Sequence, residues 1–264
     1  MRRNLAAQSL ALLRGGGRRR GPTLSHASAS APAQRTAPVA GWPERQVAAI
    51  LLTSAARASR FRPCLAPLAV VLAAGKGTRM RSDLPKVLHP LAGEPLAVHV
   101  LRSARAAGVA GLVVVVGHGA EQVEAALRPV FADLRFALQA QQLGTGHAVQ
   151  CALPAIGDHD GPVLILSGDV PLLRPATLAG LLDACASSGA GLALATFEPA
   201  DPHGYGRIVR DDHGRIQAIV EERDADAATR AIRECNAGVY CASAELLRSE
   251  LPALGRANAQ GRST

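Results

Sequence analysis

The sequence feature that most limits the possible folds is a strand-like apolar segment that breaks directly into a glycine-rich, cationic loop. Residues 68–73 read LAVVLA, and residues 75–79 read GKGTR. A buried strand that delivers backbone N–H groups and cations to one loop is typical of a phosphate site. The only two lysines of the 264 residues, Lys76 and Lys86, lie in or just after this loop, which favours a chemical role for the compact ammonium group. The loop lacks the Walker A pattern, and Met80 stands where a dinucleotide fingerprint has its third glycine.

Strand-like and helix-like segments alternate through the rest of the chain. We expect strands at 68–73, 111–116, 136–138, 162–166, 191–197 and 236–241, and helices at 96–107, 120–127, 145–153, 175–186 and 245–251. Apolar strands separated by helices predict an α/β fold with a mainly parallel sheet covered on both faces. Residues 204–221 read instead as a β-hairpin, which indicates a smaller lobe on the substrate side.

The net charge of the chain is concentrated near its N-terminus. The formal charge of +8 comes from 29 Lys and Arg against 21 Asp and Glu. Residues 1–66 hold eleven arginines and one acidic residue, Glu44, so the remainder carries 18 basic and 20 acidic side chains. Because the aromatic content is only 3% and no basic stripe occurs outside the first 66 residues, nucleic acid is not expected as a partner.

Residues 1–66 differ from the rest in being rich in Arg, Ala, Ser and Pro. Such a segment buries too little apolar surface to offset the entropy of ordering, so we expect 1–66 to be a disordered extension and 67–264 to form the folded domain. A transit peptide, a weak secretory signal at Arg2-Arg3 and an extension without function are the alternatives for this segment. Five cysteines without a C-x-x-C pair predict reduced thiols in a cytoplasmic protein, and no apolar stretch has the roughly 20 residues that cross a bilayer.

A carboxylate and a group of amides stand where expected strands end. Asp169 follows the most apolar strand, where it can hold Mg²⁺ against phosphate oxygens or simply cap the turn at Val170-Pro171. Residues 139–147 (QAQQLGTGH) place amides before a helix start. Amides and backbone N–H groups can read the edge of a base, and the alternative is an ordinary helix cap near Thr145.

The hairpin region carries polar groups suited to a sugar. The backbone of residues 204–206 (GYG) can approach a sugar closely or can be a plain loop. Glu221 and Asn236 can bind hydroxyl groups or can be ordinary surface residues. His118 and His147 have no acid or thiol at the spacing of a catalytic triad or a metal site, and we assign them no chemistry.

In chain order, the motifs of the sequence read LAAGKGTRMRSDLPKVLHPLAG, QQLGTGHAVQ, LSGDVPLL, GYGRIVR, IVEERDA, NAGVY and NAQG. Taken together, they resemble the uridyltransferase half of the bifunctional bacterial N-acetylglucosamine-1-phosphate uridyltransferase / glucosamine-1-phosphate acetyltransferase family. The resemblance covers residues 67 to about 261, and the set of motifs is more specific than any one of them.

The resemblance implies a Rossmann-like nucleotidyltransferase fold, a mainly parallel sheet with a smaller sugar-binding lobe. It also implies that UTP and N-acetylglucosamine 1-phosphate react to give UDP-N-acetylglucosamine and pyrophosphate for bacterial cell-envelope synthesis, with Mg²⁺ as cofactor. In the roles that it implies, Leu72, Ala73, Ala74 and Gly75 contact the nucleotide, Arg79 and Lys86 neutralise phosphates, Gln139, Gly144 and Thr145 read uracil, Asp169 holds Mg²⁺, and Gly206, Glu221 and Asn236 hold the sugar.

The sequence departs from the family at two places. Position 167 is Ser where many relatives have an aromatic residue. The family also continues after NAQG, with an Asn that is the second protein ligand of Mg²⁺ and then the trimer-forming acetyltransferase domain, whereas this sequence ends at Thr264. We therefore expect no acetyltransferase activity, a monomer, and a domain incomplete at its C-terminus. The alternatives are a related enzyme with another nucleotide or sugar phosphate, or an inactive nucleotide-binding fragment.

Overall fold

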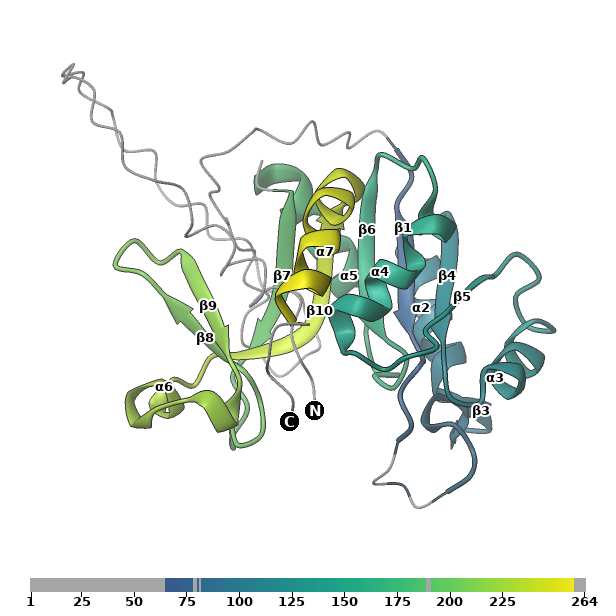
Figure 1. Cartoon of the computed structure of the whole chain (residues 1–264), viewed down its shortest axis with the longest axis horizontal. Coiled ribbons are helices and arrows are strands. Elements are labelled where there is room, and N and C mark those ends of the chain that lie inside the picture. The colour runs from purple at the N-terminus through teal and green to yellow at the C-terminus, as the bar shows by residue number, and fades with distance from the viewer. Residues whose placement is uncertain (1–64, 78–79, 81, 189–190, 259–264) are drawn as a thin grey trace.

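The structure of the chain, a computed structural model, describes residues 65–77, 80, 82–188 and 191–258 (Figure 1). The extension expected at 1–66 thus lies outside the described residues except for its last two positions, and Arg79 also lies outside them. The strands are β1 (Leu68–Leu72), β2 (Pro90–Leu91), β3 (Glu94–Pro95), β4 (Gly111–Val116), β5 (Arg135–Leu138), β6 (Pro162–Ser167), β7 (Leu192–Phe197), β8 (Arg207–Arg210), β9 (Ile216–Val220) and β10 (Cys235–Ser243). The helices are α2 (Leu96–Ala106), α3 (Ala120–Leu127), α4 (Thr145–Ile156), α5 (Pro175–Ser188), α6 (Ala227–Ala231) and α7 (Ala244–Asn258), with short 3₁₀ turns η2 (Lys86–Leu88) and η3 (Glu222–Asp224).

The central sheet has the strand order β5-β4-β1-β6-β10-β8-β9, and β7 pairs with β10 beside this path. β1 pairs in parallel with both β4 and β6, and β4 pairs in parallel with β5. β10 runs antiparallel to β6, β7 and β8. The expected α/β fold with a mainly parallel sheet is confirmed.

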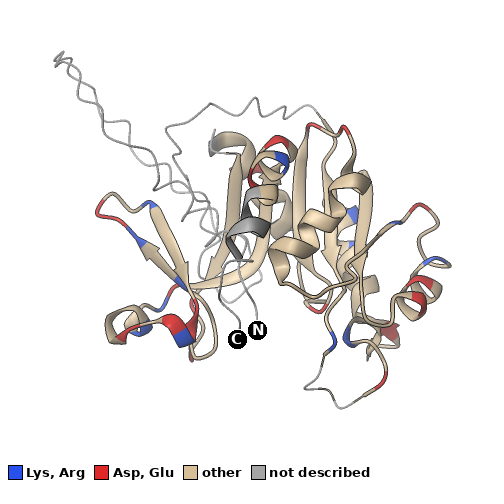
Figure 2. Cartoon of the chain, viewed as in Figure 1, with Lys and Arg blue, Asp and Glu red and all other residues tan. Residues whose placement is uncertain are grey.

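Alternate side chains of the strands enter two separate hydrophobic layers. On β1, Val70 belongs to the layer under α4 and α7, while Ala69 and Val71 belong to the layer under α2, α3 and α5. In Figure 1, α4 and α7 cross in front of the sheet and α2 and α5 lie behind it. Burial on both faces explains why these strands are continuously apolar, and Figure 2 shows the central strands almost free of charged residues.

The β8–β9 hairpin is part of the central sheet, which the sequence pattern did not indicate. β10 is nine residues long, and it pairs with β6 through its C-terminal part and with β7 through both of its ends. Its first residue, Cys235, pairs with Arg207 of β8. The pairing with β7 shifts register between Asn236 and Tyr240, and Gly238 between them has a positive φ of 71°. One long, bent strand therefore connects the β8–β9 hairpin to the parallel part of the sheet.

None of the helices in the described part of the chain is long and apolar enough to cross a bilayer.

Candidate functional site

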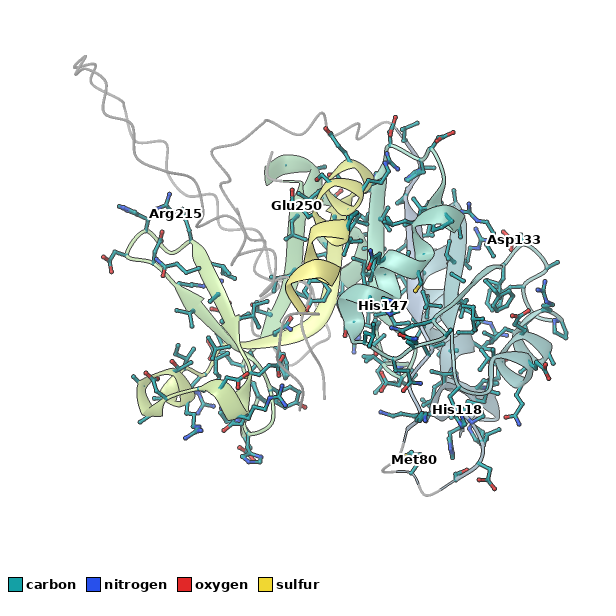
Figure 3. The ribbon with its side chains drawn as sticks, in the orientation of Figure 1. Met80, His118, Asp133, His147, Arg215 and Glu250 are labelled. Atoms are coloured by element: carbon teal, nitrogen blue, oxygen red, sulfur yellow. The ribbon has the colours of Figure 1, made fainter. Side chains whose placement is uncertain are left out.

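The candidate site lies at the edge of the sheet where three parallel strands end together. Leu72, the last residue of β1, is in register with Val115 of β4 on one side and with Ser167 of β6 on the other. The loops that follow these strands therefore leave the sheet side by side. In Figure 3, Met80 and His118, from the loops after β1 and β4, lie at this same end of the molecule. Ligands of open parallel sheets bind at such strand ends.

Ala74 lies at the centre of the contacts between these loops. Its carbonyl oxygen accepts a hydrogen bond from Gln142 Nε2 at 2.6 Å. A Cβ added at Gly117 would lie 2.9 Å from Ala74 Cβ, 3.0 Å from the Ala74 oxygen and 3.1 Å from the Gln139 carbonyl oxygen. Only glycine allows the end of β4 to approach both neighbouring segments this closely. Gln142 is a site residue to which the sequence analysis gave no individual role.

The segment 139–147 folds around the buried side chain of Gln139, which is 4% exposed. Gln139 Nε2 donates to the Gly144 carbonyl oxygen at 3.0 Å and lies 3.1 Å from His147 Nδ1. Gly144 has a φ of 112°, which favours glycine, and helix α4 begins at the next residue, Thr145. The structure thus brings together the three residues expected to read the base, at the start of α4, where Figure 3 labels the neighbouring His147.

Lys86 and Asp169 form an ion pair between the loop after β1 and the end of β6. Ser167 Oγ donates to the other carboxylate oxygen of Asp169 at 2.5 Å. The Asp169 side chain is 14% exposed and that of Lys86 is 37% exposed, so the pair is reachable from solvent on the lysine side. A Cβ on Gly77 would lie 2.9 Å from Lys86 Cβ, which explains the glycine at this close approach. The serine that departs from the family pattern therefore hydrogen-bonds the predicted metal ligand.

The three residues expected to hold the sugar lie together where the β8–β9 hairpin meets the start of β10. The Asn236 backbone N–H donates to the Gly206 carbonyl oxygen at 2.9 Å, and a Cβ on Gly206 would lie 3.6 Å from Glu221 Oε1. The Asn236 amide also donates to the Tyr240 hydroxyl at 2.9 Å. Because Tyr240 is in register with Ile165 and β10 is antiparallel to β6, Asn236 lies toward the same sheet edge as Asp169.

An ion pair between a buried arginine and a partly exposed glutamate supports the loop of residues 204–206, and the sequence analysis missed it. Arg207 is 2% exposed, and its Nη2 lies 2.7 Å from Glu222 Oε2. Arg207 Nη1 donates to the Tyr205 carbonyl oxygen at 2.5 Å, and the Gly204 N–H donates to Glu222 at 3.4 Å. The sequence did contain a signal for this pair, because Arg207 begins an otherwise apolar strand segment (RIV, 207–209). A charge that is buried with such a strand requires a partner of opposite charge.

The carboxylate of Asp169 suits a hard cation whose other ligands are oxygen atoms of a bound substrate. No group of three or more His, Cys, Asp or Glu side chains that could hold a metal ion occurs within the described residues. Asp169 offers one partly buried carboxylate at the end of β6. Mg²⁺ is commonly held by one or two carboxylates together with substrate phosphates rather than by an all-protein cage, so the residues present fit Mg²⁺.

A parallel α/β sheet that presents a glycine-rich loop, a lysine–carboxylate pair and a buried amide at one edge is the arrangement of a nucleotide-transferring enzyme. The model of the MobA-like NTP transferase domain matches residues 69–256, and the chain belongs to this family.

The relatives agree with this assignment and with the resemblance drawn from the motifs. The chain is 56% identical over 194 residues to the bifunctional protein GlmU of Anaeromyxobacter sp. (strain K), which covers 73% of this chain and 40% of the relative. It is 51% identical over 192 residues to the bifunctional protein GlmU of Pelobacter propionicus, and this match covers 73% of the chain and 42% of the relative. The chain thus spans about 40% of the length of these relatives. The structure of HddC from Yersinia pseudotuberculosis shares the fold, with a TM-score of 0.55, 20% identity, and coverage of 70% of this chain and 80% of HddC.

The close approach at Gly117 leads to a prediction about stability. We expect Gly117→Ala to destabilise the domain by about 1–3 kcal/mol, because the added methyl group meets backbone oxygens rather than flexible side chains. Urea unfolding followed by circular dichroism measures this change. The matched control is Gly75→Ala, since a Cβ there has no heavy atom within 4 Å. Equal midpoints for the two variants would contradict the packing described at Ala74.

The Arg207–Glu222 pair predicts a pH dependence of stability. Partial desolvation raises the pKa of the Glu222 carboxyl, but the hydrogen bond and charge of Arg207, with the Gly204 N–H, bring this pKa below its ordinary value. A lowered folded-state pKa stabilises the fold above the unfolded pKa of about 4.3, and this contribution is lost as the pH falls through the folded value. Glu222→Gln should therefore be less stable than the wild type at pH 7, with the difference shrinking below pH 4.

Unfolding midpoints measured at several pH values between 7 and 3 test this expectation. Asp158→Asn, at an exposed carboxylate, is the control and should show no comparable convergence. A Glu222→Gln deficit that is constant with pH would show that the carboxylate charge is not the source of the stabilisation.

Proposed function

We propose that this domain transfers the uridylyl group of UTP to N-acetylglucosamine 1-phosphate, giving UDP-N-acetylglucosamine and pyrophosphate. The observation that supports the proposal is the order of the strands that carry the candidate residues. The base-reading candidates Gln139 and Gly144 follow β5, and the Lys86–Asp169 pair joins the loop after β1 to the end of β6. The sugar candidates Gly206, which directly precedes β8, and Asn236 of β10 lie on the other side of β6. The 56% identity to GlmU of Anaeromyxobacter sp. supports the choice of substrates.

On the nucleotide side, backbone groups and one amide make the contacts. Leu72, Ala73, Ala74 and Gly75 lie at the end of β1 and in the turn that follows it, and the small side chains from Ala73 to Gly75 leave room for the nucleotide to approach the backbone. Gln139, Gly144 and Thr145 face the uracil. The Leu72 carbonyl oxygen accepts from the Gly168 N–H at 2.9 Å, so the nucleotide-binding turn and the loop that carries Asp169 are held together before any ligand arrives.

On the sugar side, Gly206, Glu221 and Asn236 bind the N-acetylglucosamine unit. The Arg207–Glu222 pair holds the loop that contains Gly206, through the carbonyl of Tyr205 and the N–H of Gly204. Tyr205 packs edge-to-face on Phe197 with ring centroids 5.0 Å apart, which fixes the same loop from the side of β7.

The reaction needs no protein nucleophile. A phosphate oxygen of the sugar phosphate attacks the α-phosphorus of UTP, the bond from that phosphorus to the bridging oxygen breaks, and pyrophosphate leaves with the electron pair. The domain aligns the two substrates, and Lys86 places positive charge beside the phosphates as charge moves to the leaving group. Asp169 would hold Mg²⁺, which when bound supplies further positive charge to the phosphate oxygens.

The proposed product indicates that the domain acts in cytoplasmic metabolism. UDP-N-acetylglucosamine is a precursor of bacterial peptidoglycan and lipopolysaccharide, so we place the reaction early in cell-envelope synthesis.

Pyrophosphate release is the direct test of the proposed function. With Mg²⁺ and N-acetylglucosamine 1-phosphate, we expect release with UTP to exceed release with CTP or GTP by at least about a hundredfold, because a site built to hydrogen-bond one base leaves buried groups unpaired with another. Substituting glucose 1-phosphate as acceptor tests the sugar side. Binding of UTP without turnover would identify a nucleotide-binding domain instead, and preference for another nucleotide would identify a related transferase.

Lys86→Ala should slow turnover more than it weakens sugar binding. Loss of its charge is expected to lower kcat by about 10²–10³-fold while leaving KM for the sugar phosphate within a few-fold, because the charge acts chiefly on the transition state. Steady-state kinetics measure both constants. Arg102→Ala is the control, since Arg102 lies on α2 and pairs with Glu94 away from the site. An increase in KM with unchanged kcat would assign Lys86 to ground-state binding only.

A further inference from the structure

The side chain of His147 lies inside the candidate base-reading segment, although the sequence analysis gave it no role. His147 is in the first turn of α4, and Gln139 follows the end of β5. The two side chains meet with Gln139 Nε2 3.1 Å from His147 Nδ1. The other ring nitrogen, His147 Nε2, lies 3.8 Å from Cys151 Sγ, one turn further along α4. The imidazole thus connects a buried amide to a thiol.

The carbonyl oxygen of Gly144 fixes the orientation of the Gln139 amide. This oxygen can only accept hydrogen bonds, so the Gln139 atom 3.0 Å away from it must be the NH₂ nitrogen. The opposite orientation would place two acceptor oxygens against each other. The same Gly144 oxygen also accepts from the Ala148 N–H at 3.1 Å, which ties it to the first turn of α4 and keeps it in place.

The fixed amide in turn determines which nitrogen of His147 carries the proton. Because the second hydrogen of the Gln139 NH₂ group points to Nδ1, that nitrogen must accept, and the proton of the neutral ring is on Nε2. Nε2–H then faces the sulfur of Cys151. Desolvation raises the pKa of the Cys151 thiol, so the sulfur stays uncharged beside this N–H group.

We propose that His147 is a positioning residue for nucleotide selection, which holds the Gln139 amide so that only its carbonyl oxygen is left to meet the base. This inference rests on the proposed function and specifies how its nucleotide is chosen. Both NH₂ hydrogens are used by Gly144 and His147, and within the described residues no donor reaches Gln139 Oε1. Gln139 therefore presents an unpaired acceptor from a side chain that is itself almost completely buried.

An acceptor at this position distinguishes the two common pyrimidines by their ring nitrogens. N3 of uracil carries a hydrogen and donates, whereas N3 of cytosine is an acceptor. Uracil pairs with Gln139 Oε1, while cytosine would leave two buried acceptors facing each other. Without an acceptor at position 147, one amide hydrogen is unpaired and the amide is held by Gly144 alone. The preference for the base that donates should then weaken.

Binding of UTP and CTP to three forms of the chain tests this inference. Calorimetric titration should show that His147→Leu, which has no acceptor, lowers the ratio of UTP to CTP affinity by about tenfold. His147→Asn is the matched variant, because its Oδ1 can accept where Nδ1 does, and it should keep the ratio within about threefold. A ratio unchanged in His147→Leu, or an equal loss of affinity for both nucleotides, would overturn the proposal in favour of a purely structural histidine.

A spectroscopic measurement on the wild-type chain makes the test independent of how the variants fold. Long-range ¹⁵N–¹H correlation of the imidazole should show the His147 proton on Nε2 and an unprotonated Nδ1. A proton on Nδ1 would overturn the proposal. The proposal would also be overturned if the wild-type chain bound UTP no more tightly than CTP, whichever nitrogen of His147 carries the proton. The proposed transferase function, in contrast, stands or falls on pyrophosphate release, so the two failures are distinguishable.

Discussion

The candidate site depends on the parallel pairing of β1 with β4 on one side and with β6 on the other. This pairing places the ends of three buried strands in one row, and it does so through a core in which the strand residues are almost completely buried. The loops after residues 72, 116 and 167 are far apart in sequence, yet they leave the sheet next to one another. A shift of register by one residue would exchange the two faces of a strand, so the hydrophobic layers also fix the position of these loops.

Hydrogen bonds between polar groups set the local shape of the site before a ligand is present. Gln142 bonds to the carbonyl of Ala74, Ser167 to Asp169, and Gln139 to the carbonyl of Gly144. The first bond joins loops that the sheet brings near, whereas the other two are local, between residues that are two and five positions apart. Ordering these side chains costs conformational entropy on folding rather than on binding, which is how a preorganised site gains affinity.

The sequence predicts the fold well because the patterns that indicate strands and helices lie within short stretches of neighbouring residues. The apolar run 68–73, the glycines that follow it and the helical periodicity of 96–107 all depend on neighbouring residues, and the structure has elements at these places. The pairing of β10 with β6, β7 and β8 is a contact between segments distant in the chain, which no local pattern encodes. For the same reason, the sequence showed Gln139 and Gly206 as candidates but not His147 or Arg207, whose roles arise only from the partners that they meet in space.

The position of β10 inside the sheet has a consequence for the order in which the domain assembles. β10 is made after all the other strands described, yet it lies between β6 and β8. During synthesis, β1, β4, β5 and β6 can pair with one another while β6 still presents an open edge of apolar residues. Unpaired edges of this kind attract other strands. The nascent chain is therefore most prone to aggregation in the interval between the emergence of β6 and that of β10. Pairing of β10 with β6 then covers the open edge.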